Sequence, residues 1–300
     1  MAMYSPVTLI LLPAFWVFLV GVGYAALFWA VGFGTVEQSS FVSGSSLLTL
    51  GFVSVEGWTQ HALAFSEATL GLGLVALLIT FLPAMYSSFA DRETMVALLD
   101  VRAGTPPSAV EFLLRYHRID GFGDLPDAWR DWERFFAQIQ ESHTSYPALV
   151  FFRSPLPEMH WVTAAGTMLD AAALYVSTCR SEPDPQAQVM LRAGFLSLRR
   201  ICDFFGIEYP ADPAPTDPIA ITKDEFLTAS EQLRSGGVSV SGDLEQAWRD
   251  YAGWRVNYDT PLLRLANITM APIAPWSSDR SAPGHTKPVI RRWGRNRTSV

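Results

Sequence analysis

Two long apolar runs constrain this chain more than any other feature of its sequence. The first run covers residues 7–33 and contains no charged residue, and the second covers residues 62–89 and contains only Glu67. A helix of about 20 apolar residues is long enough to cross the hydrocarbon core of a bilayer. Each run is therefore predicted to form a transmembrane helix.

A secretory signal peptide also carries an apolar segment near the N-terminus. The run at 7–33 is longer than the apolar core of a signal peptide, no basic residue precedes it, and a second apolar run follows it. We therefore interpret residues 7–33 as a permanent transmembrane helix.

Charged residues are distributed very unevenly around the two runs. All 22 Lys and Arg residues come after Asp91, and of the 29 Asp and Glu residues only Glu37, Glu56 and Glu67 come before it. Because basic residues stay on the cytoplasmic side of a membrane, the second run is predicted to end inside the cell. We expect a multi-pass protein of the cell membrane with both termini in the cytoplasm, so that residues 34–61 enter and leave from the outer face.

The same change in composition predicts the domain organisation. Residues 1–91 are expected to form a membrane domain, residues 92–279 a helical cytoplasmic domain, and residues 280–300 a disordered basic tail. The tail either touches the anionic inner leaflet or only aids solubility. Because acidic residues outnumber basic ones beyond residue 91, we expect no nucleic-acid partner, since phosphate groups require a basic face.

The segment 34–61 has too few apolar residues for a third span. Non-helical backbone at membrane depth survives only where protein surrounds it or where it lines a watery cavity. We therefore expect a re-entrant loop, with a short helix over 37–48 and an extended return over 49–53.

The return contains the sequence TLGF at 49–52, and the second run begins with an E-x-x-x-G pattern, Glu67 and Gly71. This layout resembles the pore domain of the potassium-channel family, in which a T-x-G-aromatic filter lies between two transmembrane helices. The closest resemblance is to bacterial two-pore-domain-like channels with a helical cytoplasmic extension. Segments of that extension resemble SYPALVFFRSPLPEMHW (145–161), LDAAAL (169–174) and WRVNYD (254–259), so that the likeness covers most of the chain.

The resemblance implies a role for the backbone of the return. Potassium filters replace the hydration shell of the ion with rings of backbone carbonyls. The corresponding residues here are Thr49, Leu50, Gly51, Phe52 and Val53, and the Thr49 hydroxyl would add the innermost ring. Gly51 accepts the left-handed backbone that such a path requires.

The sequence departs from the family pattern at two positions, because Val53 and Ser54 stand where the family has Gly and Asp. A left-handed conformation costs an L-residue about 1–2 kcal/mol, and a β-branched residue is among the least suited to it. The outermost carbonyl ring is therefore expected to be altered, which affects strict potassium selectivity more than cation passage.

One loop per chain cannot enclose an ion, so the resemblance implies a homotetramer in the lipid bilayer, with potassium or another monovalent cation as the permeant ion. Glu37 and Glu56 would then lie near the outer mouth, either as acidic rings that concentrate cations or as ordinary solvated acids. Glu67 would either brace the filter from behind or lie in the headgroup region.

Two glycines and a proline lie in the second run. Gly71 and Gly73 are expected to permit close helix packing, and the other reading is a hinge at which the helix bends. Pro83 could kink the helix near its inner end. A second glycine-rich stretch, GFGD at 121–124, has no apolar run beside it, and we interpret it as a turn between helices.

Beyond residue 91 the chain shows helical periodicity without strand alternation, which predicts an all-α domain and hence an all-α membrane protein. Helices are expected over 108–117, 128–141, 159–178, 186–205, 224–234 and 244–265, with loops at 208–218 and 235–243. The β-containing nucleotide-binding regulators of bacterial channels would show a strand followed by G-x-G-x-x-G, and neither is present.

No constellation of reactive side chains indicates an enzyme. Cys179 and Cys202 lack metal-ligand spacing, and His143 and His160 have no partners at catalytic spacing. We therefore expect no cofactor, no metal other than permeant ions, and no catalytic residue. The sequence favours a cation channel for potassium; the alternative is a non-conducting, membrane-anchored signalling or scaffold protein with a degenerate pore loop.

Overall fold

The computed structural model describes residues 4–179 and 184–281, and this part of the chain is helical without a strand. The chain divides into two compact units, Met1–Ser87 and Ser88–Val300. This division falls close to residue 91, where the composition changes. The tail residues 282–300 lie outside the described part.

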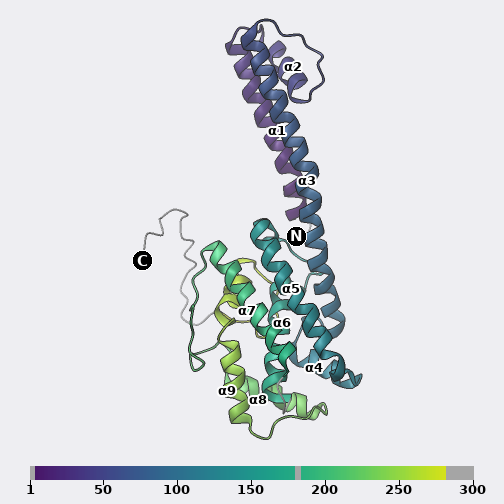
Figure 1. The fold of residues 1–300 in the computed structure, drawn as a ribbon, viewed down its shortest axis with the longest axis vertical. Coiled ribbons are helices and arrows are strands. Elements are labelled where there is room, and N and C mark those ends of the chain that lie inside the picture. The colour runs from purple at the N-terminus through teal and green to yellow at the C-terminus, as the bar shows by residue number, and fades with distance from the viewer. Residues whose placement is uncertain (1–3, 180–183, 282–300) are drawn as a thin grey trace. The chain divides into compact units, whose positions relative to one another are not determined.

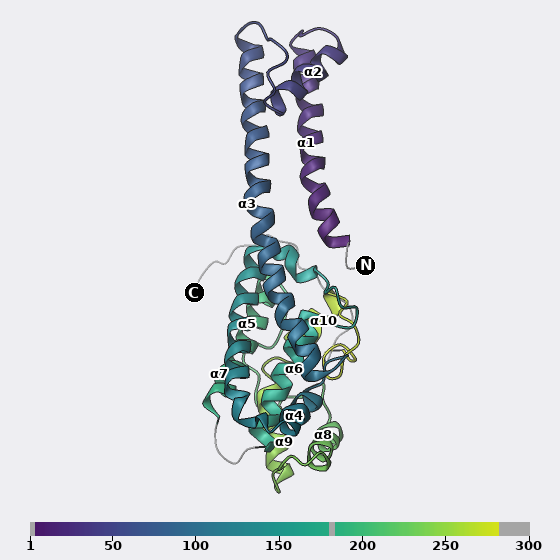
Figure 2. The same cartoon turned by 90° about the vertical axis from the view of Figure 1, so that its right-hand side faces the viewer.

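The first unit consists of α1 (Tyr4–Ala30), α2 (Val36–Leu47) and the portion of α3 (Trp58–Ala103) that precedes Ser88. Within this unit α2 lies near the end of α1 and the beginning of α3, next to the two loops that join it to these helices (Figures 1 and 2). A short helix between two long apolar ones is what the sequence predicts for residues 1–91.

α2 begins at a capping box that its own sequence supplies. The backbone N–H of Gln38 donates to Oγ1 of Thr35, and the Gln38 side chain accepts from the backbone N–H of Thr35. Two of the backbone N–H groups that every helix leaves unpaired at its start are satisfied in this way. The cap places the start of α2 at Val36, one residue before the predicted start.

α1 and α3 each contain a stretch that is long and apolar enough to cross a membrane. Only 6% of this stretch in α1 and 11% in α3 is buried within the chain, whereas the core helix of a water-soluble domain would be mostly buried. The exposed side chains include large apolar ones such as Phe18, Leu72 and Ile79.

The predicted ends of both long helices are wrong by several residues. α1 ends at Ala30 rather than at Phe33, and Gly32, with φ +80°, follows it. α3 does not end at Phe89 but continues to Ala103, since buried apolar residues recur at helical spacing up to that point. The helix stops before Gly104, whose φ is +81°.

The second unit contains the end of α3 and seven further α-helices among its described residues. These are α4 (Ala109–Arg118), α5 (Leu125–Ser145), α6 (Trp161–Leu174), α7 (Pro185–Phe205), α8 (Lys223–Ser235), α9 (Leu244–Arg255) and α10 (Asp259–Ile268). Short helical turns η1 (Gly121–Asp124), η2 (Pro147–Phe151) and the π-turn η3 (Tyr175–Cys179) connect some of them. The stretch GFGD is thus a turn between helices, as predicted.

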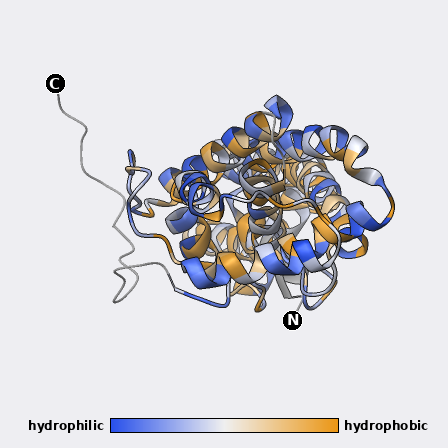
Figure 3. Ribbon diagram, turned by 90° about the horizontal axis from the view of Figure 1, so that it is seen from below, coloured by the Kyte–Doolittle hydropathy of each residue, from blue (hydrophilic) through white to orange (hydrophobic). Residues whose placement is uncertain are grey.

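α6 is the centre of this unit, and all of its residues are buried. Small residues allow neighbouring helices to approach it closely: a Cβ atom on Gly166 would lie 2.8 Å from Leu262, and one on Gly194 would lie 2.5 Å from Leu169. The surrounding helices carry both hydrophilic and hydrophobic residues along their length, as amphipathic helices do (Figure 3). The alanine-rich sequence of α6 therefore serves as the packing surface of the domain.

The single helix predicted over 244–265 is instead two helices, α9 and α10. Proline at position 261 has no backbone N–H, so it could not bond the carbonyl of Asn257 within a continuous helix. That carbonyl instead accepts a hydrogen bond of 2.9 Å from Nε of Arg199 in α7. The break after Arg255 is thus explained by one proline and the arginine that satisfies the freed carbonyl.

Candidate pore loop and its supports

Two residues of the loop after α2 have a left-handed backbone. Thr49 has φ +51° and Gly51 has φ +70°, and both values lie in the left-handed region. Glycine adopts this region without a steric penalty, whereas threonine does not. Val53 is not left-handed, so the strain that its β-branched side chain would cause at a glycine position does not arise.

The N–H groups of the loop are directed to α2. Oγ of Ser45, which is buried, accepts hydrogen bonds from the backbone N–H groups of Phe52 (2.8 Å) and Val53 (3.3 Å). The N–H of Leu50 donates to the carbonyl oxygen of Ser45 at 2.8 Å. A single serine thus anchors most of the return segment.

The carbonyl groups of the same loop are left available. Within the described residues, none of the five carbonyl oxygens from Thr49 to Val53 accepts a hydrogen bond. Backbone carbonyls are strong acceptors that rarely stay unpaired away from water. These oxygens therefore require water, an ion or another chain as their partner.

Glu67 is buried where α3 meets α2. Its Oε1 lies 2.5 Å from Oγ of Ser43, and the same hydroxyl lies 2.9 Å from the carbonyl oxygen of Gly21 in α1. Ser43 and Glu67 are 1% and 0% exposed. The Ser43 hydroxyl thereby connects α2 to both long helices. The bracing role of Glu67 stays a prediction.

The two glycines of α3 differ sharply in their surroundings. A Cβ atom at Gly71 would lie 2.0 Å from the carbonyl oxygen of Leu47, the last residue of α2. Among the described residues, no atom outside the helix's own backbone lies within 4 Å of the equivalent position at Gly73. Gly71 therefore allows α3 to touch the end of α2, whereas Gly73 has no such contact with the described residues.

The remaining predicted residues of the first unit lie away from these contacts. Glu37 is exposed in the first turn of α2, and the exposed Glu56 donates its backbone N–H to Gln60. Neither bonds to residues 49–53 within the described part of the chain. Pro83 is exposed, and α3 continues past it as one helix.

Arg92 anchors the start of the second unit and is buried. Its guanidinium donates to the carbonyl oxygens of Leu149 (2.7 Å) and Phe152 (2.8 Å) and pairs with Glu93 at 2.7 Å. Burial and the nearby Arg92 charge hold the pKa of His143 well below its usual range. This arginine therefore fixes the part of α3 that belongs to the second unit to the turn η2 and to the residue that follows it.

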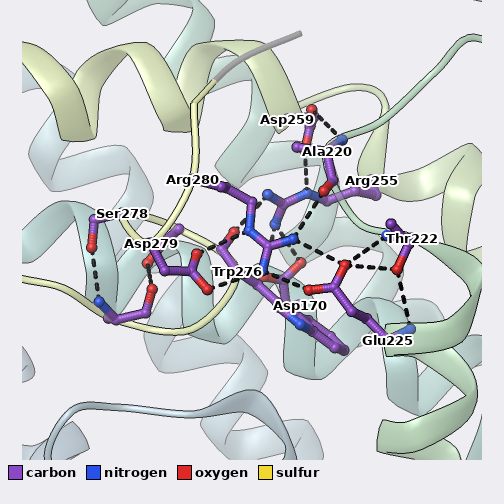
Figure 4. A network of polar contacts seen from close by, with 12 residues as sticks. Asp170, Ala220, Thr222, Glu225, Arg255, Asp259, Trp276, Ser278, Asp279 and Arg280 are labelled. Carbon is purple, nitrogen blue, oxygen red and sulfur yellow. Dashed lines mark hydrogen bonds and ion pairs between the residues drawn. The ribbon is translucent and has the colours of Figure 1, made fainter.

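A second buried polar network lies at α6 (Figure 4). Both carboxylate oxygens of Asp170 accept from Nη1 of Arg255 at 2.7 Å, and Nε of Arg255 donates to Asp259 at 2.7 Å. The hydroxyls of Tyr251 and Tyr258 donate to the same Asp170 carboxylate. Although burial acts to lower it, the two carboxylates raise the pKa of Arg255 well above its usual range.

The segment after α10, residues 269–281, joins this network. Nη2 of Arg255 donates to the carbonyl oxygen of Trp276 at 2.7 Å, and Arg280 pairs with Glu225 of α8 at 2.9 Å (Figure 4). Arg280 is the residue at which the basic tail was predicted to begin. The ordered contacts of the domain thus extend into the first residue of that segment.

Metal and thiol chemistry find no support in the described residues. Among these residues no group of three or more His, Cys, Asp or Glu side chains is placed to hold a metal ion. Cys179 and Cys202 are both free thiols, and burial raises the pKa of Cys179 to about 12. A thiol with such a pKa is unreactive at neutral pH.

Comparison with protein-family models, with curated proteins and with solved structures returns no match. The assignment of a function therefore depends on the residues of this chain.

Proposed function

We propose that the chain is one subunit of a tetrameric cation channel, with potassium as the permeant ion and residues 49–53 as its filter. The observation that carries this proposal is the polarity of the loop. Ser45 accepts the N–H groups of Phe52 and Val53, while the carbonyl oxygens from Thr49 to Val53 have no partner in the part of the chain that the structure describes. A segment that turns its donors to protein and leaves its acceptors free is suited to binding cations.

The exposed apolar surface of the first unit supports a membrane location. Phe15, Trp16 and Phe18 of α1 and Phe65 and Leu72 of α3 are all more than half exposed. In water such a surface is unfavourable, at roughly 25 cal/mol for each Å² of apolar area. Lipid acyl chains and neighbouring subunits would cover these side chains in a membrane.

The filter side chains support assembly with further copies. Leu50 is 50% exposed and Phe52 is 80% exposed in the single chain. A single loop cannot surround an ion, whereas four loops around an axis supply complete rings of carbonyls. Neighbouring copies would bury these side chains and complete the rings in the same step.

In the proposed channel, the ion exchanges its water shell for carbonyl oxygens of the loop, and Ser45 keeps these oxygens from turning away. α2 contributes as well, because the C-terminal end of a helix carries a partial negative charge that favours cations. Ser43 and Glu67 hold α2 in place from behind. Val53 changes the outer ring, so selectivity among monovalent cations is the property in which this channel is expected to differ most from the family pattern.

The alternative is a non-conducting, membrane-anchored signalling or scaffold protein. The residues that favour it are Val53 and Ser54, which replace the second glycine and the aspartate of the family pattern. Such a protein would keep the helical second unit but would pass no ions.

The experiment that tests the proposal compares two neighbouring serines of α2. The full chain is reconstituted in liposomes, and potassium flux is measured for the natural sequence, for Ser45→Ala and for Ser46→Ala. Ser45→Ala removes the acceptor of two loop N–H groups and should reduce flux or potassium selectivity by about tenfold or more. Ser46→Ala, whose hydroxyl holds no loop N–H, should leave both unchanged.

The outcomes separate the two hypotheses. Flux in the natural protein that Ser45→Ala selectively impairs supports the filter. Absence of flux from correctly assembled tetramers supports the scaffold protein. Equal behaviour of the two serine variants contradicts the role given to the loop.

A further inference from the structure

Phe89, the residue at which the second apolar run ends, belongs to the second unit and packs there against the residue that follows η2. The ring centroids of Phe89 and Phe152 are 5.7 Å apart. The guanidinium carbon of Arg92 lies 5.1 Å from the centroid of the Phe89 ring, and the same guanidinium donates to the carbonyl oxygen of Phe152. These contacts fix the start of the segment 152–157 beside the end of the apolar run.

A second segment is bound to the first. The guanidinium of Arg153 donates to the carbonyl oxygen of Met270, just after α10, at 2.8 Å. Residues 152–157 and 269–275 therefore lie together, and we call them the paired loops. Neither loop contains an acidic residue, and each contains two prolines. Arg153 has no carboxylate partner among the described residues, so the protein does not neutralise its charge.

The paired loops expose large apolar side chains. Leu156 is 40% exposed, Met270 is 71% exposed and Ile273 is 77% exposed. Ala274, the neighbour of Ile273, is buried, and its N–H donates to Oγ of Ser278 at 2.9 Å. The turn is thus attached to the domain, and it holds Ile273 at the surface while the next residue packs inward.

Met270 has a backbone conformation that its side chain does not favour. It follows α10 with φ +49°, in the left-handed region. Glycine or asparagine is usual at this position, because the conformation is costly for other residues. The N–H of Met270 donates to the carbonyl oxygen of Asn267, and its own carbonyl accepts from Arg153. A glycine would avoid both the strain and the exposed apolar side chain, so the contacts within the domain do not account for methionine here.

The position of the paired loops favours a lipid surface as their partner. If α3 crosses the membrane, residue 89 lies where the helix leaves the hydrocarbon core on the cytoplasmic side. Segments that contact this residue then lie at the depth of the lipid headgroups. Apolar side chains beside a basic one bind to this region, since the apolar groups enter the acyl boundary and the basic group meets phosphates.

We propose that the paired loops bind the headgroup region of the cytoplasmic leaflet. Leu156, Met270 and Ile273 insert between the lipids, and Arg153 faces the lipid phosphates. This contact rests on the membrane location of α3 in the proposed function, but it does not require that the protein conducts ions. It attaches the second unit to the lipid by residues that are far apart in the sequence from the membrane-spanning stretches.

The test compares two isoleucines of the second unit that have nearly the same exposure. The full chain is reconstituted in liposomes, and Ile273→Cys and Ile119→Cys each carry one bimane fluorophore. Ile119, at the end of α4, is 74% exposed and lies outside the paired loops. The native thiols of Cys179 and Cys202 stay unlabelled, because burial raises the pKa of both well above the usual range.

Two further labelled variants report on the membrane location itself. Phe18→Cys lies in α1 and Ile79→Cys in α3, at side chains that are 65% and 67% exposed in the single chain. For every variant, fluorescence in liposomes of lipid brominated close to the headgroup is compared with that in unbrominated liposomes, since bromine quenches a fluorophore that reaches the acyl chains. Interfacial side chains lie about 5–10 Å below the headgroup boundary, so the label at 273 should lose about half of its fluorescence and the label at 119 less than about one tenth.

The outcomes separate the lipid contact from the channel. Quenching at 273 without quenching at 119 supports the contact, and it does so even if the protein passes no potassium. Quenching at 18 or 79 together with equally weak quenching at 273 and 119 overturns the contact and leaves the channel proposal standing. A blue-shifted emission at 273 without quenching shows that protein covers the paired loops, which also overturns it. Absence of quenching at both 18 and 79 removes the membrane location, and the contact and the channel then fail together.

Discussion

The buried arginine of α9 should be one of the most sensitive positions of the second unit. Arg255 is 0% exposed, and its partners Asp170 and Asp259 are 2% and 3% exposed. Arg255→Met keeps the volume of the side chain but leaves two carboxylates without their cation. Breaking a buried ion pair from one side costs about 3–5 kcal/mol, because an uncompensated charge stays in the interior.

The loss of unfolding free energy expected for Arg255→Met can be compared with the loss expected for the same substitution at an exposed arginine of α9. Among the described residues, Arg249 donates only to Oε1 of Gln246, three residues before it. Arg249→Met should therefore cost at most about 1 kcal/mol, the usual range for a surface interaction. The two variants differ in burial and not in the chemistry of the substitution.

The assay is urea unfolding of the full chain in detergent micelles, followed by tryptophan fluorescence. Seven of the ten tryptophans lie beyond residue 91, so the fluorescence reports mainly on the second unit. The expected result is a large loss of unfolding free energy for Arg255→Met and a small one for Arg249→Met. A loss below about 1 kcal/mol for Arg255→Met would refute the account of this network as a stabilising centre.

Three further predictions concern the loop, its support and the pH dependence of folding. Gly71→Ala should abolish cation flux, because the new methyl group would lie 2.0 Å from the carbonyl oxygen of Leu47, whereas Gly73→Ala should have no effect on flux. Val53→Gly should raise the potassium-over-sodium permeability ratio measured from reversal potentials, and an unchanged ratio counts against the filter. Burial lowers the pKa of His160 to about 3, so below about pH 6.5 the unfolded chain takes up a proton that the folded chain does not, and stability falls as the pH decreases. His160→Asn keeps a side-chain acceptor at the start of α6 and should flatten this dependence in urea titrations between pH 4 and 7; an unchanged slope would exclude His160 as its source.

Much of the helical architecture could be predicted because it depends on local patterns. The long apolar runs, the Thr35–Gln38 cap and the glycine after α7 are each visible in a few consecutive residues. The break between α9 and α10 had a visible cause as well, Pro261, but the apolar periodicity on both sides of it favoured one helix. Periodicity alone does not show where a helix loses a hydrogen bond.

The parts that could not be predicted are those set by contacts between distant residues. Nothing in the serine-rich sequence of α2 distinguishes Ser45, which anchors the loop, from Ser46, which does not. Arg92 directly follows an apolar run, and basic residues in such positions are often found at a membrane interface. Its guanidinium is instead buried, and the carbonyl oxygens that accept its hydrogen bonds belong to residues 57 and 60 positions later. Asp170 likewise acquires its role only when α9 and α10 fold against α6.

An experimental density map of the full chain in nanodiscs in potassium buffer would show whether the loop coordinates ions. We expect four copies around one axis, with ion density coordinated by the carbonyl oxygens of residues 49–53 from every copy. A particle with fewer copies, or four loops whose carbonyl oxygens point away from the axis, would contradict this expectation.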